Sequence, residues 1–144
     1  MRIYVASSWR NGAGALGMAS ILRSVGHEVD CFCDDSGGRY VFHWREITDK
    51  IRELNARTFL LHPQTQLAFA EDRKWLDWAE GVVMVLPCGN SAHLEAGYAV
   101  GRGKPLWIFG DLPAGEFDVM YGFANLVTED IRELLQRIAE ESPG

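Results

Sequence analysis

The chain has 144 residues and a formal net charge of −6, and 47% of its residues are apolar. A chain of this length fits one domain, 1–144, that buries roughly two-thirds of the surface its unfolded form exposes. The composition excludes a disordered or fibrous protein. The acidic balance disfavours a nucleic-acid partner, which needs a basic face, but one or two arginines can still hold a small anion locally.

The three cysteines, at positions 31, 33 and 88, match no zinc-binding spacing and cannot all pair within one chain. We therefore expect reduced thiols in a cytoplasmic protein, and we expect neither a metal nor a cofactor. The apolar run at the N-terminus lacks the long core and cleavage site of a signal peptide. No run approaches the ~18 apolar residues of a membrane span, so a membrane partner is not expected.

The first predicted elements alternate between strand and helix. Residues 3–6 form an apolar run that predicts a strand, and the polar loop 7–12 leads into a helix over 14–25. Residues 28–33 alternate between polar and apolar and predict a second strand. Turn residues at 34–38 then end this strand.

The middle of the chain predicts two helices. The aromatic residues 42–44 lead into an amphipathic helix through Ile47, Ile51 and Leu54. After a loop around residue 63, apolar side chains at helical spacing predict a second helix over 65–80.

The last part of the chain repeats the alternation. Residues 82–86 form a continuous apolar run, which is typical of a central parallel strand covered on both faces. A helix over 91–102 and a strand over 105–109 follow. A short strand at 126–127 precedes a terminal helix that begins near residue 128.

Strands that alternate with helices predict a parallel sheet with right-handed crossovers. The expected class is therefore α/β, a doubly wound five-stranded parallel sheet with helices on both faces. Ligands of such sheets bind beyond the carboxyl ends of the strands. This rule selects three loops, at 7–12, 34–44 and 87–95.

The first of these loops combines hydroxyl groups, an aromatic ring, a guanidinium and an amide just before a helix: Ser7, Ser8, Trp9, Arg10 and Asn11. Free N–H groups at the start of a helix, together with Arg10, can bind an anion. Gly12, Gly14 and Gly17 match the dinucleotide-binding spacing, but they lie several residues beyond the strand, so this match is weak. An ordinary connecting loop is the alternative interpretation.

Glu95 lies about one turn into a predicted helix that is otherwise almost wholly apolar. The helix dipole and nearby N–H groups favour its ionised form, so we expect a carboxylate at neutral pH that can act as a nucleophile. The simpler interpretation is a glutamate that only complements the dipole. The apolar surroundings favour a functional role.

Asp72 is a second candidate carboxylate, on the preceding helix and close to an anchoring Trp75-Leu76 pair. Two carboxylates can divide nucleophilic and acid-base roles when their environments separate their pKa values. Aromatic residues of the second loop offer either a stacking face for a planar heterocycle or ordinary core packing. They are Tyr40, Phe42, His43 and Trp44.

Three segments, at 3–11, 72–76 and 87–105, resemble the nucleoside 2-deoxyribosyltransferase family and its relatives, the nucleoside 5'-monophosphate N-glycosidases. The most specific part runs from Glu95 to Pro105 and reads Glu-Ala-Gly-Tyr-Ala-Val-Gly-Arg-Gly-Lys-Pro. The resemblance implies a flavodoxin-like fold, a homodimer or higher homo-oligomer, and cleavage of an N-glycosidic bond.

The resemblance also implies residue roles. The family's nucleophilic glutamate corresponds to Glu95, and the aspartate that assists the base or the sugar corresponds to Asp72. The loop 7–11 corresponds to the segment that holds the sugar or its 5'-phosphate, and Ser91 to a phosphate-binding serine. Many of the transferases carry an aspartate six residues before the nucleophile, where this chain has Gly89.

The sequence thus predicts an enzyme that cleaves a nucleoside or nucleotide through a covalent glycosyl-enzyme on Glu95. Water or a second nucleobase then accepts the sugar, which makes the enzyme a hydrolase or a transferase. Predicted substrate-binding residues are Ser7, Ser8, Trp9, Arg10, Asn11, Phe42, Trp44, Gly89 and Ser91. Two alternatives remain open, a non-catalytic nucleotide sensor and an N-glycosidase acting on NAD-like nucleotides.

Overall fold

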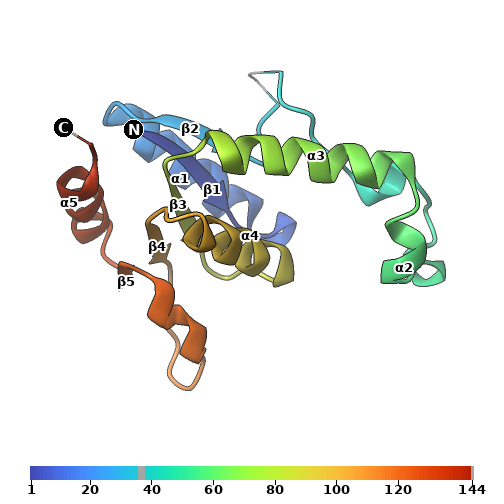
Figure 1. Cartoon of the computed structure of the whole chain (residues 1–144). Helices are drawn as coiled ribbons and strands as arrows, with labels where there is room; N and C mark the ends of the chain where they lie inside the picture. Colours follow the sequence, from blue (N-terminus) through green and yellow to red (C-terminus); the bar gives the residue numbers. More distant parts are fainter. Residues whose placement is uncertain (36–37, 144) are drawn as a thin grey trace.

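The computed structural model describes residues 1–35 and 38–143 (Figure 1). Its centre is a five-stranded sheet in which all neighbouring strands are parallel. In spatial order the strands are β2 (Glu28–Cys31), β1 (Arg2–Ala6), β3 (Gly81–Val85), β4 (Leu106–Phe109) and β5 (Leu126–Thr128). The order 2-1-3-4-5 is that of a flavodoxin-like, doubly wound α/β fold, as the sequence predicted.

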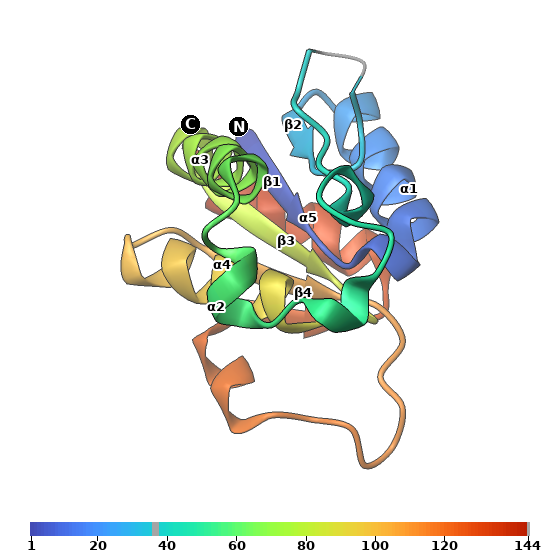
Figure 2. The same ribbon diagram turned by 90° about the vertical axis from the view of Figure 1, so that its right-hand side faces the viewer.

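Four helices cover the two faces of the sheet (Figures 1 and 2). One face carries α1 (Gly12–Ser24) and α5 (Ile131–Glu141), whose apolar residues pack in one core cluster. The other face carries α3 (Pro63–Trp78) and α4 (Asn90–Gly101), which pack in a second cluster. Pro at the first position of α3 needs no N–H partner, which suits a helix start.

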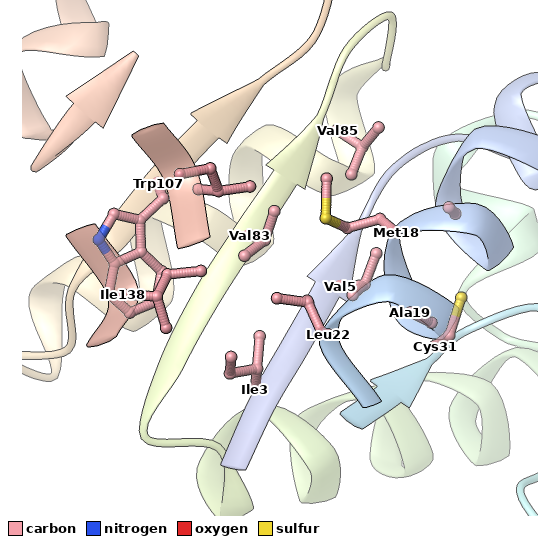
Figure 3. Close-up of a cluster of buried hydrophobic side chains, with 12 residues drawn as sticks. Ile3, Val5, Met18, Ala19, Leu22, Cys31, Val83, Val85, Trp107 and Ile138 are labelled. Carbon is pink, nitrogen blue, oxygen red and sulfur yellow. The ribbon is translucent and has the colours of Figure 1, made fainter. Parts of the chain in front are cut away.

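The core cluster under α1 and α5 is hydrophobic, and the indole N–H of Trp107 within it donates to Glu141 of α5 at 2.9 Å. The odd-numbered strand residues Ile3, Val5, Val83 and Val85 point to this face, where Leu22 of α1 meets them (Figure 3). Successive side chains of a strand alternate between the faces, so the even-numbered neighbours point to the opposite layer.

The face under α3 and α4 receives two polar side chains from the strands. Tyr4 of β1 is fully buried and belongs to this second cluster. Its register partner on β2 is Asp30, which is also buried. Because paired residues of neighbouring strands share a face, the sheet itself places this phenol and this carboxylate side by side.

The predicted helix through Ile47, Ile51 and Leu54 is wrong. The structure has two separate 3-10 turns there, Trp44–Glu46 and Ile51–Glu53. The hydroxyl of Thr48 accepts a hydrogen bond from the backbone N–H of Lys50, which competes with helical bonding. Ile51 is 51% exposed, so the segment also lacks the packing that stabilises a short amphipathic helix.

Two further segments were not predicted as structured elements. A short helix, α2 (Ala56–Phe59), precedes α3, and the 3-10 helix Val119–Phe123 precedes β5. The chain between β4 and β5 extends away from the sheet in Figure 2. Within the described residues, no helix is both long and apolar enough to cross a membrane.

Candidate active site

The loops that follow β1 and β3 are joined directly at the carboxyl edge of the sheet. The hydroxyl of Ser7 donates to the carbonyl of Val85 at 2.8 Å, and Nδ2 of Asn11 donates to the carbonyl of Leu86 at 3.2 Å. A Cβ on Gly14 would lie 2.5 Å from Oδ1 of Asn11, so a larger residue there would displace the Asn11 side chain. Two predicted ligand-binding residues, Ser7 and Asn11, therefore also have a structural role.

Glu95 is held between α4 and the sheet. Its side chain is half-buried, and its Oε2 accepts a hydrogen bond from the hydroxyl of Tyr4 in β1. Around it, Ala92, Ala96 and Ala99 of α4 pack against the strands. These small side chains bring the helix backbone close to the sheet, so Glu95 can reach Tyr4.

The ionisation state expected for Glu95 needs correction. Burial raises its pKa to about 8, against the lowering effect of the Tyr4 hydrogen bond, and the negative charge of Asp72 adds to the rise. Because α4 begins at Asn90, Glu95 lies in its second turn, where the helix dipole has little effect. The protonated acid, not the carboxylate, therefore predominates at neutral pH in the free protein.

Asp72, the second predicted carboxylate, takes part in a buried ion-pair network. Nη2 of Arg39 donates to Asp72 Oδ1 at 2.7 Å. The same guanidinium bonds both carboxylate oxygens of Asp30, from Nε at 3.0 Å and from Nη2 at 3.4 Å. The network joins β2, the chain that follows β2, and α3.

The charges in this network act on one another. Burial raises the pKa of Asp30 to about 6, with the Arg39 guanidinium opposing the rise. Burial alone would lower the pKa of Arg39, but Asp30 and Asp72 raise it above its ordinary value. Burial also raises the pKa of Asp72, and Arg39 opposes that rise. At pH 7 the Asp30–Arg39 pair is ionised.

Hydrogen bonds through the neighbouring residue Tyr40 hold Arg39 against α3. Its Nη1 donates to the carbonyl of Tyr40 at 2.9 Å, and the N–H of Tyr40 donates to Glu71 Oε1 at 3.1 Å. The same oxygen accepts a bond from the indole of Trp75 at 2.9 Å. Glu71 and Trp75 therefore anchor the chain that carries Arg39.

Aromatic residues of the first two loops meet at the carboxyl edge of the sheet. The ring of Trp9 lies 4.8 Å from that of His43 and 5.4 Å, edge-on, from that of Phe32. Trp9 remains 49% exposed, so the group of rings is open to a ligand. Of the predicted binding residues in the second loop, Phe42 packs against Phe59 with ring centroids 6.0 Å apart, and the guanidinium of Arg45 lies over the Trp44 ring.

The remaining predicted residues lie around the same edge. Arg10 and Ser91 are exposed, as is Gly89, which directly precedes α4. Ser8 is half-buried at the start of a 3-10 turn. Residues 36 and 37 of the second predicted loop lie outside the described part of the chain.

A cavity of about 690 Å³ lies along a different face of α4 from Glu95. It opens between α4, β4 and the chain around residues 118–123, and Leu94, Gly97 and Ile108 are among its lining residues. Neither Glu95 nor Asp72 lines this cavity, so the candidate site is the group of polar side chains around these two acids. Over the described residues, no cluster of His, Cys, Asp or Glu fits a metal ion.

Sequence reasoning missed three members of the polar network, namely Tyr4, Asp30 and Arg39. The strand pattern contains a signal for the first two, because both occupy positions that point to the same covered face of the sheet. Arg39 lies in a non-periodic segment, and its partners are 9 and 33 positions away in sequence. No local pattern identifies such a residue.

No protein-family model matches the chain, and no curated protein matches it in sequence. The structure is similar to a CMP N-glycosidase of Clostridium botulinum, with a TM-score of 0.57 and 14% identity over 96% of this chain and 99% of that chain. It is also similar to a 2-deoxyribosyltransferase from Bacillus psychrosaccharolyticus, with a TM-score of 0.56 and 20% identity over 93% of this chain and 90% of that chain. At these identities the structural similarity establishes the fold alone. One of the two proteins is an N-glycosidase and the other a deoxyribosyltransferase, the two groups of enzymes that the sequence segments resemble.

Proposed function

We propose that this protein is an enzyme that cleaves the N-glycosidic bond of a nucleoside or nucleoside 5'-monophosphate. The observation that carries the proposal is the position of Glu95, bonded to Tyr4 and under the electrostatic influence of Asp72. The fold that the chain shares with an N-glycosidase and a deoxyribosyltransferase supports it. The sequence resemblance of the segment from Glu95 to Pro105 points to the same activity.

The proposed mechanism is a double displacement at the anomeric carbon. Before attack Glu95 gives up the proton that it holds in the free protein, and Asp72 takes one up. A Glu95 oxygen then attacks C1', the bond from C1' to the base nitrogen breaks, and the base leaves with the proton that Asp72 supplies. Water or a second base then attacks C1' and releases Glu95, while Asp72 takes up the proton of this acceptor. Glu95 attacks only as a carboxylate, a form that the Tyr4 hydroxyl stabilises.

The first loop is the proposed site for the sugar and its 5'-phosphate. Arg10 is exposed beside the start of α1, where N–H groups lack helical partners. The half-exposed ring of Trp9 offers a face for a planar base. Phosphate contacts far from the reacting bond supply binding energy that orients the sugar.

We also propose a homodimer or higher homo-oligomer in the cytoplasm. The chain between β4 and β5 carries large apolar side chains that the single chain leaves in solvent, including Phe117 at 85% and Val119 at 88% exposure. A second copy of the chain would cover them, because apolar surface of this kind is characteristic of interfaces. Sedimentation of the purified protein tests this assembly.

The direct test of the function is base release by Glu95→Ala. Wild type is incubated with nucleosides, nucleoside 5'-monophosphates and NAD, with and without an acceptor base, and free base is quantified by chromatography. We expect Glu95→Ala to lose at least about a thousandfold in rate, or ~4 kcal/mol of transition-state stabilisation, with an unchanged circular dichroism spectrum. Glu140→Ala, on an exposed face of α5, is the control.

Each other outcome of this screen has a distinct meaning. Near-normal base release by Glu95→Ala would exclude the assignment. Base release from NAD alone would favour the NAD-like substrate class, and nucleotide binding by wild type without base release would favour a sensor.

The phosphate role of Arg10 has its own test. We expect Arg10→Ala to raise KM for a nucleoside 5'-monophosphate by about tenfold or more, because a charge-assisted contact is lost. KM for the matching nucleoside should change little. Equal effects on the two substrates would remove Arg10 from the phosphate site, and Arg132→Ala on α5 serves as a control for general charge effects.

A further inference from the structure

Arg39 is the one buried cation that the proposed mechanism leaves unused within the described residues. Its side chain is 5% exposed, and each of its three nitrogens donates a hydrogen bond, to Asp30, Asp72 or the carbonyl of Tyr40. Burying a guanidinium is costly unless it is paired in this way. Hydrogen bonds from all three nitrogens also leave the group little freedom to move.

The two carboxylates that Arg39 joins differ in their access to solvent. The Asp30 side chain is 4% exposed and binds Arg39 through both oxygens. The Asp72 side chain is 40% exposed, and only its Oδ1 is bonded to Arg39. In the part of the chain that the structure describes, Oδ2 of Asp72 has no hydrogen-bond partner, so this oxygen is available to a ligand.

Asp30 therefore anchors the guanidinium, and the guanidinium orients Asp72. We propose that Arg39 is a positioning residue that holds Asp72 Oδ2 toward the leaving base and sets the pH range over which this oxygen can deliver a proton. The inference rests on the proposed function, because it assigns to Asp72 the protonation of the base. Arg39 itself touches neither the sugar nor the base in this arrangement.

The electrostatic surroundings of Asp72 agree with this role. Among the titratable groups around Asp72, Arg39 lowers its pKa and Glu71 of α3 raises it, while Asp72 in turn raises the pKa of Tyr4, Asp30 and Glu95. Burial and the negative charge of Glu71 disfavour the carboxylate form of Asp72, and the positive charge of Arg39 favours it. Loss of Arg39 should therefore raise the pKa of Asp72 as well as free its side chain.

The test uses variants that separate positioning from folding. Arg39→Met alone leaves Asp30 buried without a partner, so the main variant is the double substitution Arg39→Met with Asp30→Asn. Arg39→Lys keeps the charge but replaces the planar fork with a single ammonium, which cannot reproduce both pairings. Arg23→Met is the matched control, because Arg23 pairs with Asp34 outside the network.

The kinetic measurement is how far kcat/KM of each variant depends on the leaving group of the substrate. For each variant, kcat/KM is measured for a nucleoside that the wild type cleaves and for the 4-nitrophenyl glycoside of the same sugar, whose phenolate leaves without a proton. We expect the double variant to lose at least about tenfold more on the nucleoside than on the nitrophenyl glycoside. Arg39→Lys should fall between wild type and the double variant, and Arg23→Met should match wild type.

The second readout does not need activity. Carboxyl ¹³C NMR titration of Asp72 should show its pKa rising by about one unit or more in the double variant, a tenfold change in proton affinity. An unchanged pKa in a folded double variant, or equal kinetic losses on both substrates, would overturn the role of Arg39. If wild type cleaves neither substrate, the proposed function fails, and the titration still decides whether Arg39 controls Asp72.

Discussion

The two faces of the sheet differ in what they bury. The face under α1 and α5 is filled by apolar side chains such as Ile3, Val5 and Leu22. At the alternate positions of the same strands, the face under α3 and α4 receives Tyr4 and Asp30, which bond to charged side chains. Both faces are equally covered by helices, so burial is not what distinguishes them.

The comparison shows how one sheet can carry an apolar core on one face and buried titratable groups on the other. On the apolar face, burial of side chains such as Ile3, Val5 and Leu22 adds favourable transfer free energy, and these side chains have no polar group to satisfy. On the other face, burial raises the pKa values of Glu95, Asp72 and Asp30, which costs free energy whenever the groups ionise. Shifted acids of this kind are typical of catalytic sites.

The largest expected effect comes from a cavity in the apolar face. Leu22→Ala removes a fully buried side chain and should lower the free energy of unfolding by about 2–5 kcal/mol. The folded fraction should keep its kcat/KM, because Leu22 contacts no polar group of the site. Leu76→Ala on the opposite face should cost a similar amount but also reduce kcat/KM, since α3 carries Asp72.

Urea denaturation and base-release kinetics on the same samples check this pair. If Leu22→Ala and Leu76→Ala reduced kcat/KM equally at equal stability loss, the functional difference between the faces would not exist.

The next largest expected effect is a higher free energy of unfolding at high pH when Glu95 is replaced on the polar face. Glu95 has a folded-state pKa of about 8 against an ordinary value of 4.5, so the folded protein binds the extra proton between these pH values. The free energy of unfolding of wild type should therefore fall as pH rises through this window. Glu95→Gln keeps a partner for Tyr4 but cannot ionise, so it should be more stable than wild type at pH 9, by up to about a few kcal/mol.

Chemical denaturation of both proteins at pH 5 and pH 9 measures this difference, with Glu140→Gln as the exposed control. A constant difference between wild type and Glu95→Gln across the range would show that Glu95 does not titrate as described.

The smallest expected effect is a shift in the pH-rate profile. The Tyr4 hydroxyl lowers the pKa of Glu95, so Tyr4→Phe should move the rising limb of kcat/KM to higher pH, by about half a unit to one unit. Tyr98→Phe is the matched control on α4, because Tyr98 donates to the exposed Asp77. If the rising part of the kcat/KM profile of Tyr4→Phe lay at the same pH as in wild type, the Tyr4 hydroxyl would not set the pKa of Glu95.

Most of the fold was predictable because its signals are local. A short apolar run predicts a strand whatever its neighbours are, and β3 is buried at every position, as its continuous run predicted. The predicted helix through Ile47, Ile51 and Leu54 failed because the central residue Ile51 is 51% exposed, and tertiary packing stabilises most short helices. The spacing of apolar residues in the sequence does not show whether another element will pack against them.

The candidate site was predictable only in part. Glu95 was identifiable because a charge on an apolar helix is unusual, and Asp72 because a known motif includes it. The ionisation of Glu95 was predicted wrongly, because helix position was weighed and burial was unknown. Phe42 and Trp44 were chosen for their loop and their aromatic rings, and their role in binding stays a prediction.

The sequence by itself determined the doubly wound sheet, and it predicted the edge for ligand binding and the two acids of the candidate site. These depend on patterns within a dozen neighbouring residues. Only the tertiary structure decided which groups surround the acids, because Tyr4, Arg39 and Asp72 come from three distant parts of the chain. A proton's affinity for a carboxylate depends on the charges and solvent around it, and these exist only once the chain has folded.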